Sequence, residues 1–242
     1  MRNYANLRAN FSTGFRAPTP GQSNYTRVVS SYDKATGMQV KEGTLKPTDP
    51  MSIALGALAL DPEESENISV GLTSSYIENL NLSLDYYSVD ITNKIIKSRS
   101  LPVFGDTEFS ELSFYTNALD MKVSGIDFSA SYTLKWGTKL GIAINSNQIE
   151  VTSQNKVNGL DPVLPLTVFN LENNLPELRV SANVDHRFSN GISLMFRLNH
   201  YGETIDERST QEKVDPAQLI DVELSYKVSD KLTVVLGANN IF

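Results

Sequence analysis

Few side chains in this sequence are arranged as a catalytic site would need them. The closest approach is a run of carboxylates, Asp61, Glu63 and Glu64, in the segment DPEESEN. General acid–base catalysis needs such a group to converge with a second one inside a pocket, and the neighbouring sequence marks neither. We therefore interpret these three carboxylates as part of a solvated loop.

Nucleophilic and metal chemistry is also poorly supported. The chain has no cysteine and two histidines, His186 and His200. The strand pattern described below places them at opposite ends of neighbouring strands, too far apart to share a metal ion. The sequence has no glycine-rich phosphate loop and no G-x-S-x-G or H-E-x-x-H motif. We expect no enzymatic activity, no metal site and no cofactor.

The bulk composition narrows the remaining classes. The formal net charge is −7 and neither end carries a basic block, which argues against nucleic-acid binding. No segment approaches 18 consecutive apolar residues, so a transmembrane helix is not expected. The opening MRNYANLRANFS has no apolar stretch of the kind found in a signal peptide, and we expect a mature or truncated chain.

Alternation of apolar and polar residues dominates the sequence. In LNLSLDYY, residues 80–87, the leucines at 80, 82 and 84 alternate with Asn81, Ser83 and Asp85, as in a strand with one apolar and one polar face. The phase shifts after Tyr87, which a bulge or an exit from the apolar zone would explain. The pattern predicts nine strands, at roughly 4–15, 65–76, 80–96, 120–135, 139–153, 175–188, 191–205, 217–229 and 231–242.

The connections between these strands alternate in length. Tight turns are predicted at 77–79, 136–139, 189–191 and 229–230, and the long connections run for about 50, 20, 20 and 12 residues. Pro50 after Asp49 predicts a helix near 50–58 in the longest connection. We expect almost no helix elsewhere.

Three features favour a membrane barrel over a soluble sandwich, which shows the same alternation. The strands of about 10 to 15 residues are long enough to cross an outer membrane. Short turns at one end and long loops at the other are typical of outer-membrane barrels. Apolar-face aromatics gather near the tight turns, as in a membrane-interface girdle: Tyr76, Tyr132, Phe188 and Tyr226, with Trp136 in a turn.

The predicted fold class is therefore all-β, an antiparallel transmembrane β-barrel with its polar face toward a water-filled interior. An antiparallel barrel needs an even number of strands to close, and an open sheet in lipid leaves backbone groups unpaired. Nine strands then indicate a part of a larger barrel, with residues 1–242 forming one partial domain.

Several segments resemble the C-terminal half of TonB-dependent outer-membrane receptors. The similarity lies in five segments in the family's order: LRANFSTGFRAPTPGQ (7–22), LDPEESENISVGL (60–72), LNLSLDYYSVDITNKI (80–95), YTNALDMKVSGIDFSASY (115–132) and the closing LIDVELSYKVSDKLTVVLGANNIF. The resemblance implies a barrel of about 22 strands in the bacterial outer membrane. It implies a plug domain inside the barrel and uptake of a scarce nutrient, such as an iron–siderophore complex, with energy from TonB. Compared with the family, this sequence lacks the plug domain, the TonB box, the early strands and the last strand.

Three arginines are candidates for ligand contact on the interior wall: Arg16, Arg179 and Arg197. For Arg16 we favour a structural charge over a contact with ligand or plug. Arg179 and Arg197 would line a path for an anionic ligand, or would pair with other wall charges or the plug. Two other functions stay open at this point: a passive porin-type or structural barrel without a plug, and a soluble β-sandwich binding module.

Overall fold

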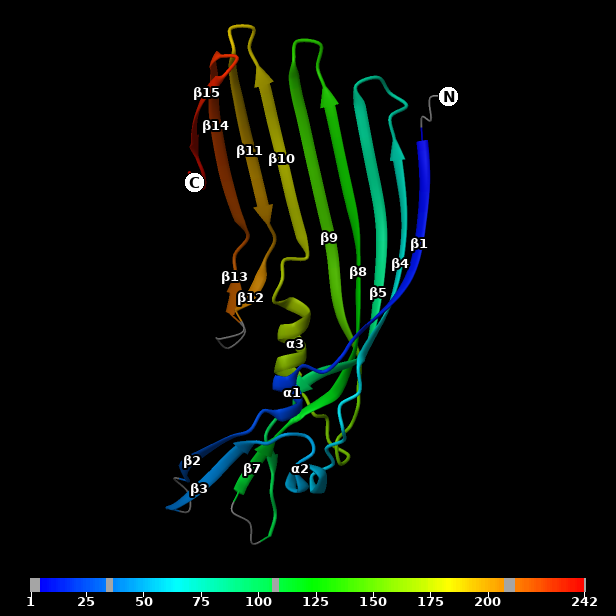
Figure 1. Cartoon of the computed structure of the whole chain (residues 1–242), viewed down its shortest axis with the longest axis vertical. Coiled ribbons are helices and arrows are strands. Elements are labelled where there is room, and N and C mark those ends of the chain that lie inside the picture. The colour runs from blue at the N-terminus through cyan, green and yellow to red at the C-terminus, as the bar shows by residue number, and fades with distance from the viewer. Residues whose placement is uncertain (1–4, 34–36, 106–108, 207–211, 242) are drawn as a thin grey trace.

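A computed structural model describes residues 5–33, 37–105, 109–206 and 212–241. Nine antiparallel strands form one open sheet, with β1 and β15 at its two edges (Figure 1). All nine predicted strands are present. The sheet is a partial barrel, because its edge strands β1 and β15 do not pair with each other. In sheet order the strands are β1 (Ala5–Arg16), β4 (Glu63–Ser74), β5 (Leu80–Lys97), β8 (Tyr115–Thr133), β9 (Thr138–Gln154), β10 (Leu178–Arg187), β11 (Ile192–Tyr201), β14 (Ala217–Ser229) and β15 (Leu232–Ala238).

The two ends of the sheet differ as the sequence predicts. Four tight hairpins lie at the top in Figure 1, and the long loops gather at the bottom. Two of the hairpins contain a glycine with positive φ, Gly137 and Gly191, both at 83°, a conformation that glycine adopts without steric cost. The alternation of turn lengths is therefore confirmed.

The long loops hold more structure than predicted. Strands β2 (Arg27–Asp33), β3 (Met38–Thr44), β7 (Phe109–Ser113) and β6 (Leu101–Pro102) form a second sheet, and β12 (Thr204–Asp206) pairs with β13 (Glu212–Val214). Helix α2 (Pro50–Ala54) confirms the predicted helix with a shorter span. Outside α2, helix is confined to two short loop segments, α1 (Pro20–Asn24) and α3 (Pro165–Asn173), which the sequence pattern did not predict individually.

Proline at the first helical position explains where these helices begin. Each of the three helices starts with a proline, whose fixed φ suits that position. Thr19 adds a capping box to α1, and Asp49 caps α2 through the Met51 amide. Within the described part of the chain, every helix is too short or too polar to cross a membrane.

The apolar face of the large sheet is open. One row, paired directly from strand to strand, contains Tyr132, Leu140, Val184, Phe196 and Val222. Phe196 is 41% exposed, and Leu72, on the same face in β4 near the other edge of the sheet, is 45% exposed. The predicted girdle aromatics at the turn end are exposed too. Across the described residues no second layer covers this face, which contradicts the sandwich alternative.

The two faces exchange character toward the loop end. Beyond Tyr86 and Ile126 the outward face becomes polar, with Asp90, Lys122 and Glu150 paired in one row. On the inward face Ile91, Met121 and Val151 become apolar at the same level and pack near α3. Pairing of β5 with β8 is unbroken from Leu80 to Ile91, and its bulges lie between Ile91 and Ile95. The phase shift after Tyr87 therefore marks the exit from the apolar zone.

The buried core lies under the loops rather than in the span of the sheet. One cluster joins Leu119, Met121 and Val163 to Val168 and Leu171, which places α3 on the inward face of β8 and β9. A second cluster consists of Ala57, Leu101, Phe114 and Val157. In a soluble protein of this size the main sheet would carry the core, so its position here fits a sheet that is solvated by lipid.

Candidate functional site

The inward face of β1, β4 and β5 carries a self-contained ion pair. Arg8 Nη2 and Asp85 Oδ2 are 2.6 Å apart, and Ser83 donates a hydrogen bond of 2.9 Å to the same carboxylate. This pair crosses Gly71 on the strand between them. A Cβ at position 71 would lie 1.8 Å from Asp85 Oδ1, so glycine is required for the approach of the two charges.

Other inward-facing aspartates accept hydrogen bonds from the neutral side-chain amides of asparagines. Asn145 donates to Asp127 at 2.7 Å. Asn199 donates to Asp221 at 3.4 Å while accepting a hydrogen bond of 2.8 Å from Ser181. Asn183 donates in the same way to Asp185. Asp127, Asp185 and Asp221 therefore have side-chain partners that carry no charge.

The three candidate arginines do not form one cluster. Arg179 in β10 and Arg197 in β11 are exposed on the inward face, and neither side chain has a hydrogen bond or ion pair with another described residue. Arg16 lies at the loop end of β1, where its guanidinium pairs with Glu63. Sequence reasoning placed all three on the polar face but did not distinguish paired from unpaired arginines.

Glu63 joins three strands at the loop end. Its carboxylate accepts Arg16 Nε at 2.9 Å and the Ile95 amide at 2.9 Å, and Lys94 Nζ lies 3.5 Å away. The residue is 5% exposed. The expectation of a solvated carboxylate loop is therefore wrong for Glu63, because the strand pairing of β1, β4 and β5 brings two cations and an amide to it.

The protonation of Glu63 follows from these contacts. At its level the outward neighbour is Glu64, opposite Thr92, so the strand has already left the apolar band. Burial would raise the pKa of Glu63, but the bonds from Arg16 and the Ile95 amide and the charge of Lys94 hold the pKa below its ordinary value. The carboxylate is ionised at neutral pH.

Asn117 ties the neighbouring loops to the same end of the sheet. Its side chain bonds both backbone groups of Asp61, each at 2.9 Å, and the carbonyl of Asn93 at 2.7 Å. Asp120 accepts the Asn93 amide at 3.0 Å and the Ser153 hydroxyl at 2.7 Å. Three of the five segments that resemble the family, 60–72, 80–95 and 115–132, thus meet at one junction.

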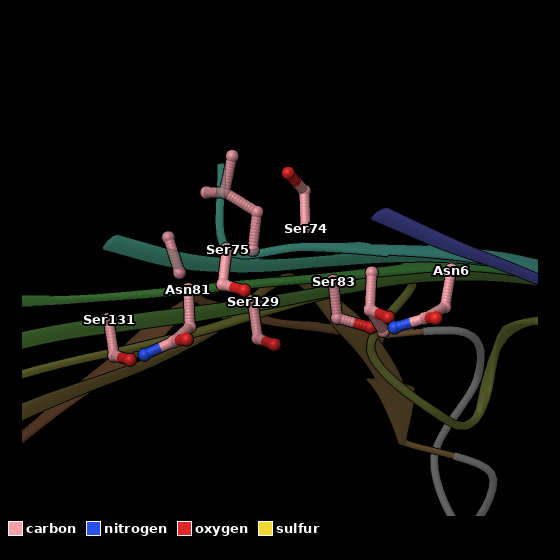
Figure 2. Close-up of a pocket in the computed structure, with 10 residues that line it drawn as sticks. Asn6, Ser74, Ser75, Asn81, Ser83, Ser129 and Ser131 are labelled. Carbon is pink, nitrogen blue, oxygen red and sulfur yellow. The ribbon is translucent and has the colours of Figure 1, made fainter. Parts of the chain in front are cut away.

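Nearer the hairpin end, the inward face holds a hollow of about 370 Å³. Figure 2 shows Asn81, Ser83, Ser129 and Ser131 on its floor, pointing to one side of the sheet. No charged side chain lines it. Small hydroxyl and amide groups such as these bind water or polar solutes, and they have no arrangement suited to bond-breaking chemistry.

The histidines lie where the sequence places them. His200 is opposite Val180 and His186 is opposite Leu194, at the two ends of the β10–β11 pair. His186 Nδ1 is 2.7 Å from the Thr138 hydroxyl, and its ring meets Phe188 edge-on at 4.2 Å. Among the described residues there is no cluster of three or more His, Cys, Asp or Glu side chains that would hold a metal ion.

Comparisons with known proteins agree with this geometry. A family model described as TonB dependent receptor-like, beta-barrel matches residues 2–241. No curated protein matches the sequence. A mutant ferric enterobactin receptor from Pseudomonas aeruginosa, crystallised with enterobactin, is 17% identical with a TM-score of 0.71, covering 100% of this chain and 34% of the receptor.

Two further solved structures share the fold. The siderophore receptor PirA from Pseudomonas aeruginosa is 18% identical with a TM-score of 0.60, over 100% of this chain and 37% of that one. The FrpB iron transporter from Neisseria meningitidis is 17% identical with a TM-score of 0.57, over 76% and 27%. The chain thus spans about a third of the length of the structures that it resembles.

Proposed function

Because the chain belongs to the TonB-dependent receptor family, we propose that it forms part of the barrel of an outer-membrane transport receptor. One observation carries the proposal: in the hairpin half of the sheet an apolar face is exposed across nine strands, while the charged residues at the same level line the other face. Only a lipid solvent makes that arrangement favourable, because in water the exposed apolar rows would drive association.

The alternation of turns and loops sets the orientation. Short hairpins lie on the periplasmic side of outer-membrane barrels, and long loops lie outside the cell. The loop end carries the second sheet, the three helices and both buried clusters. We assign ligand capture to this end, where the Glu63 and Asn117 junctions hold the loops against β1, β4, β5 and β8.

The ligand class is inferred from the similar structures. Two of them are named as receptors of siderophores or of a ferric siderophore, and one as an iron transporter. We propose an iron–siderophore complex as the transported ligand. Since the chain spans about a third of those structures, we assign the plug domain and the contact with TonB to parts of the receptor outside residues 1–242.

The candidate arginines then have different roles. Arg16 is assigned to structure, because Glu63 holds its guanidinium at the rim. Arg179 and Arg197 are assigned to ligand contact on the interior wall. We propose no enzymatic activity for this chain, because transport by this family requires no covalent bond to be broken.

Uptake by the full-length receptor tests the proposal. Cells with and without the receptor gene would be given a panel of radiolabelled ferric siderophores, before and after the proton gradient is collapsed. We expect receptor-dependent uptake of at least one chelate that stops when the gradient is lost. Uptake that continues after the proton gradient is collapsed would support a passive barrel. A receptor that remains soluble without detergent would contradict its assignment to the membrane.

A further inference from the structure

Two asparagines in the sequence are followed by glycine, Asn158 before Gly159 and Asn190 before Gly191. An asparagine in this position reacts with its own backbone when the glycine amide nitrogen attacks the side-chain carbonyl carbon. Glycine permits the attack because it has no side chain beside that nitrogen and its backbone rotates freely. The surroundings of the reacting atoms therefore decide which of the two pairs reacts in the folded chain.

The reacting groups of the first pair are free. Asn158 and Gly159 form a two-residue turn with φ of 51° and 79°, which Val157 and Leu160 close through backbone hydrogen bonds of 2.9 and 3.0 Å. Both turn residues are exposed. Among the described residues, neither the Asn158 side chain nor the Gly159 amide has a hydrogen-bond partner. A Cβ at position 159 would meet no atom within 4 Å, so the turn is open to water.

The same groups of the second pair are occupied. The Asn190 side-chain oxygen accepts the Ile192 amide at 3.2 Å. The Gly191 amide donates to the Phe188 carbonyl at 3.3 Å. Both hydrogen bonds must break before the Gly191 nitrogen reaches the Asn190 side chain, and their loss raises the barrier for this pair. The first pair has no such bonds to lose.

We propose that Asn158 is a site of spontaneous deamidation in the loops of the receptor. The Gly159 nitrogen gives its proton to water and bonds to the Asn158 side-chain carbonyl carbon, and the side-chain nitrogen leaves as ammonia. Water then opens the resulting succinimide ring at either carbonyl, which leaves aspartate or isoaspartate at position 158. The reaction needs no oxidant, enzyme or cofactor, and it replaces a neutral amide by a carboxylate.

Deamidation at this turn acts on the contact between three loops. Val157 belongs to a buried cluster that two other connections complete: Ala57, Leu101 and Phe114. Gly56 packs so closely on the turn that a Cβ there would lie 3.3 Å from the Asn158 amide nitrogen. Isoaspartate carries the main chain through its side-chain carbon and so lengthens the turn. Because the length of a two-residue turn fixes the pairing beside it, the modified loop loses the bonds between Val157 and Leu160.

Ageing of the purified full-length receptor in lipid vesicles tests the proposal. The protein would be kept at mildly alkaline pH in water enriched in heavy oxygen, then digested in ordinary water, and mass spectrometry would follow the peptides of both pairs. We expect Asn158 to convert at least roughly tenfold faster than Asn190, a ratio that corresponds to about 1.4 kcal/mol. The product should contain heavy oxygen and include isoaspartate, because direct hydrolysis gives aspartate alone.

Two controls connect the rates with the fold. In the receptor unfolded by urea, Asn158 and Asn190 should convert at similar rates, since neither pair keeps its native contacts. The Asn158→Gln variant has a longer side chain that does not close this ring, so it should stay unmodified. Exchange of the Leu160 amide proton should then become faster during ageing of the wild type and remain constant in the variant.

Three results would overturn the inference. If Asn190 converts as fast as Asn158 in the folded receptor, the hydrogen bonds of the second pair do not control the reaction. If Asn158 converts in urea but stays intact in the folded receptor, the turn protects it. Aspartate without isoaspartate would exclude the succinimide ring. The inference does not depend on the proposed function, because ferric-siderophore uptake is measured separately on receptor that has not been aged.

Discussion

A matched pair of substitutions in β14 tests which face of the sheet meets lipid. Val222 and Glu223 are adjacent, but strand pairing places Val222 in the row with Phe196 and Glu223 opposite Met195 on the other face. Arginine introduced at position 222 would face outward, and arginine introduced at 223 would face the interior. The same side chain thus samples both solvents one residue apart.

The expected magnitude follows from the depth of Val222. It lies four residues from the girdle residue Tyr226 (226 − 222), which at about 3.3 Å per residue and a tilt near 40° is roughly 10 Å below the interface. The apolar band is about 25 Å tall, so Val222 is close to its centre. Val222→Arg should cost about 2–4 kcal/mol, or about 30-fold to 1000-fold in the folding equilibrium.

Glu223→Arg should change the folding free energy by less than about 1 kcal/mol, because the interior position is exposed and watery. The assay is urea unfolding of the full-length receptor in lipid vesicles, followed by tryptophan fluorescence and by heat-dependent gel mobility. Equal losses for the two variants, or a larger loss for Glu223→Arg, would show that the assignment of faces is wrong.

Three further outcomes follow from the contacts. Gly71→Ala would force Asp85 away from Arg8, since the new Cβ would lie 1.8 Å from Asp85 Oδ1, and should lower the midpoint of the same unfolding assay; an unchanged midpoint would argue against the pair. Glu63→Gln should lower the protection of the Ile95 amide proton, which is its exchange rate measured against the intrinsic rate at the same pH. In the wild type this protection should also fall as pH drops through the lowered pKa of Glu63, because a carboxylate with a depressed folded pKa contributes stability above its ordinary pKa and loses it on acidification. An Ile95 amide proton that is already unprotected in the wild type at neutral pH would contradict its hydrogen bond to Glu63. Leu119→Ala removes a side chain with 0% exposure from the cluster under α3 and should cost about 2–5 kcal/mol locally; it should raise proteolysis of the α3 loop while leaving the hairpin ends intact, and equal loosening of both ends would refute a separate loop core.

Strand count and face assignment were predictable from the sequence because a strand repeats every two residues. The alternation in 80–87 places Leu84 outward and Asp85 inward, and the register confirms it. The same pattern showed that the apolar and polar positions exchange after Tyr87, but a bulge and an exit from the apolar zone explained this exchange equally well. The unbroken pairing to Ile91 and the packing of Ile91 near α3 decide between them.

The loops were less predictable because their structure depends on contacts between distant segments. β3 pairs in parallel with β7 across about 70 residues of sequence, for example between Gly43 and Leu112. Helix α3 has a weak pattern of its own and is held by the cluster with Val163 and by Glu172, which accepts the Val151 amide at 2.9 Å. Local propensity contains none of this information.

By itself the sequence determined that the chain makes long strands with one apolar and one polar face, because side-chain alternation is a local property of the extended backbone. It also determined which end of the sheet has tight turns. Only the tertiary structure decided which charges are paired. Arg8, Arg16, Arg179 and Arg197 look alike along the chain, yet the first two meet Asp85 and Glu63 while the last two have no partner among the described residues. The reason is that ion pairs form across strands, where lateral register and the space left by a residue such as Gly71 determine which charges come within reach.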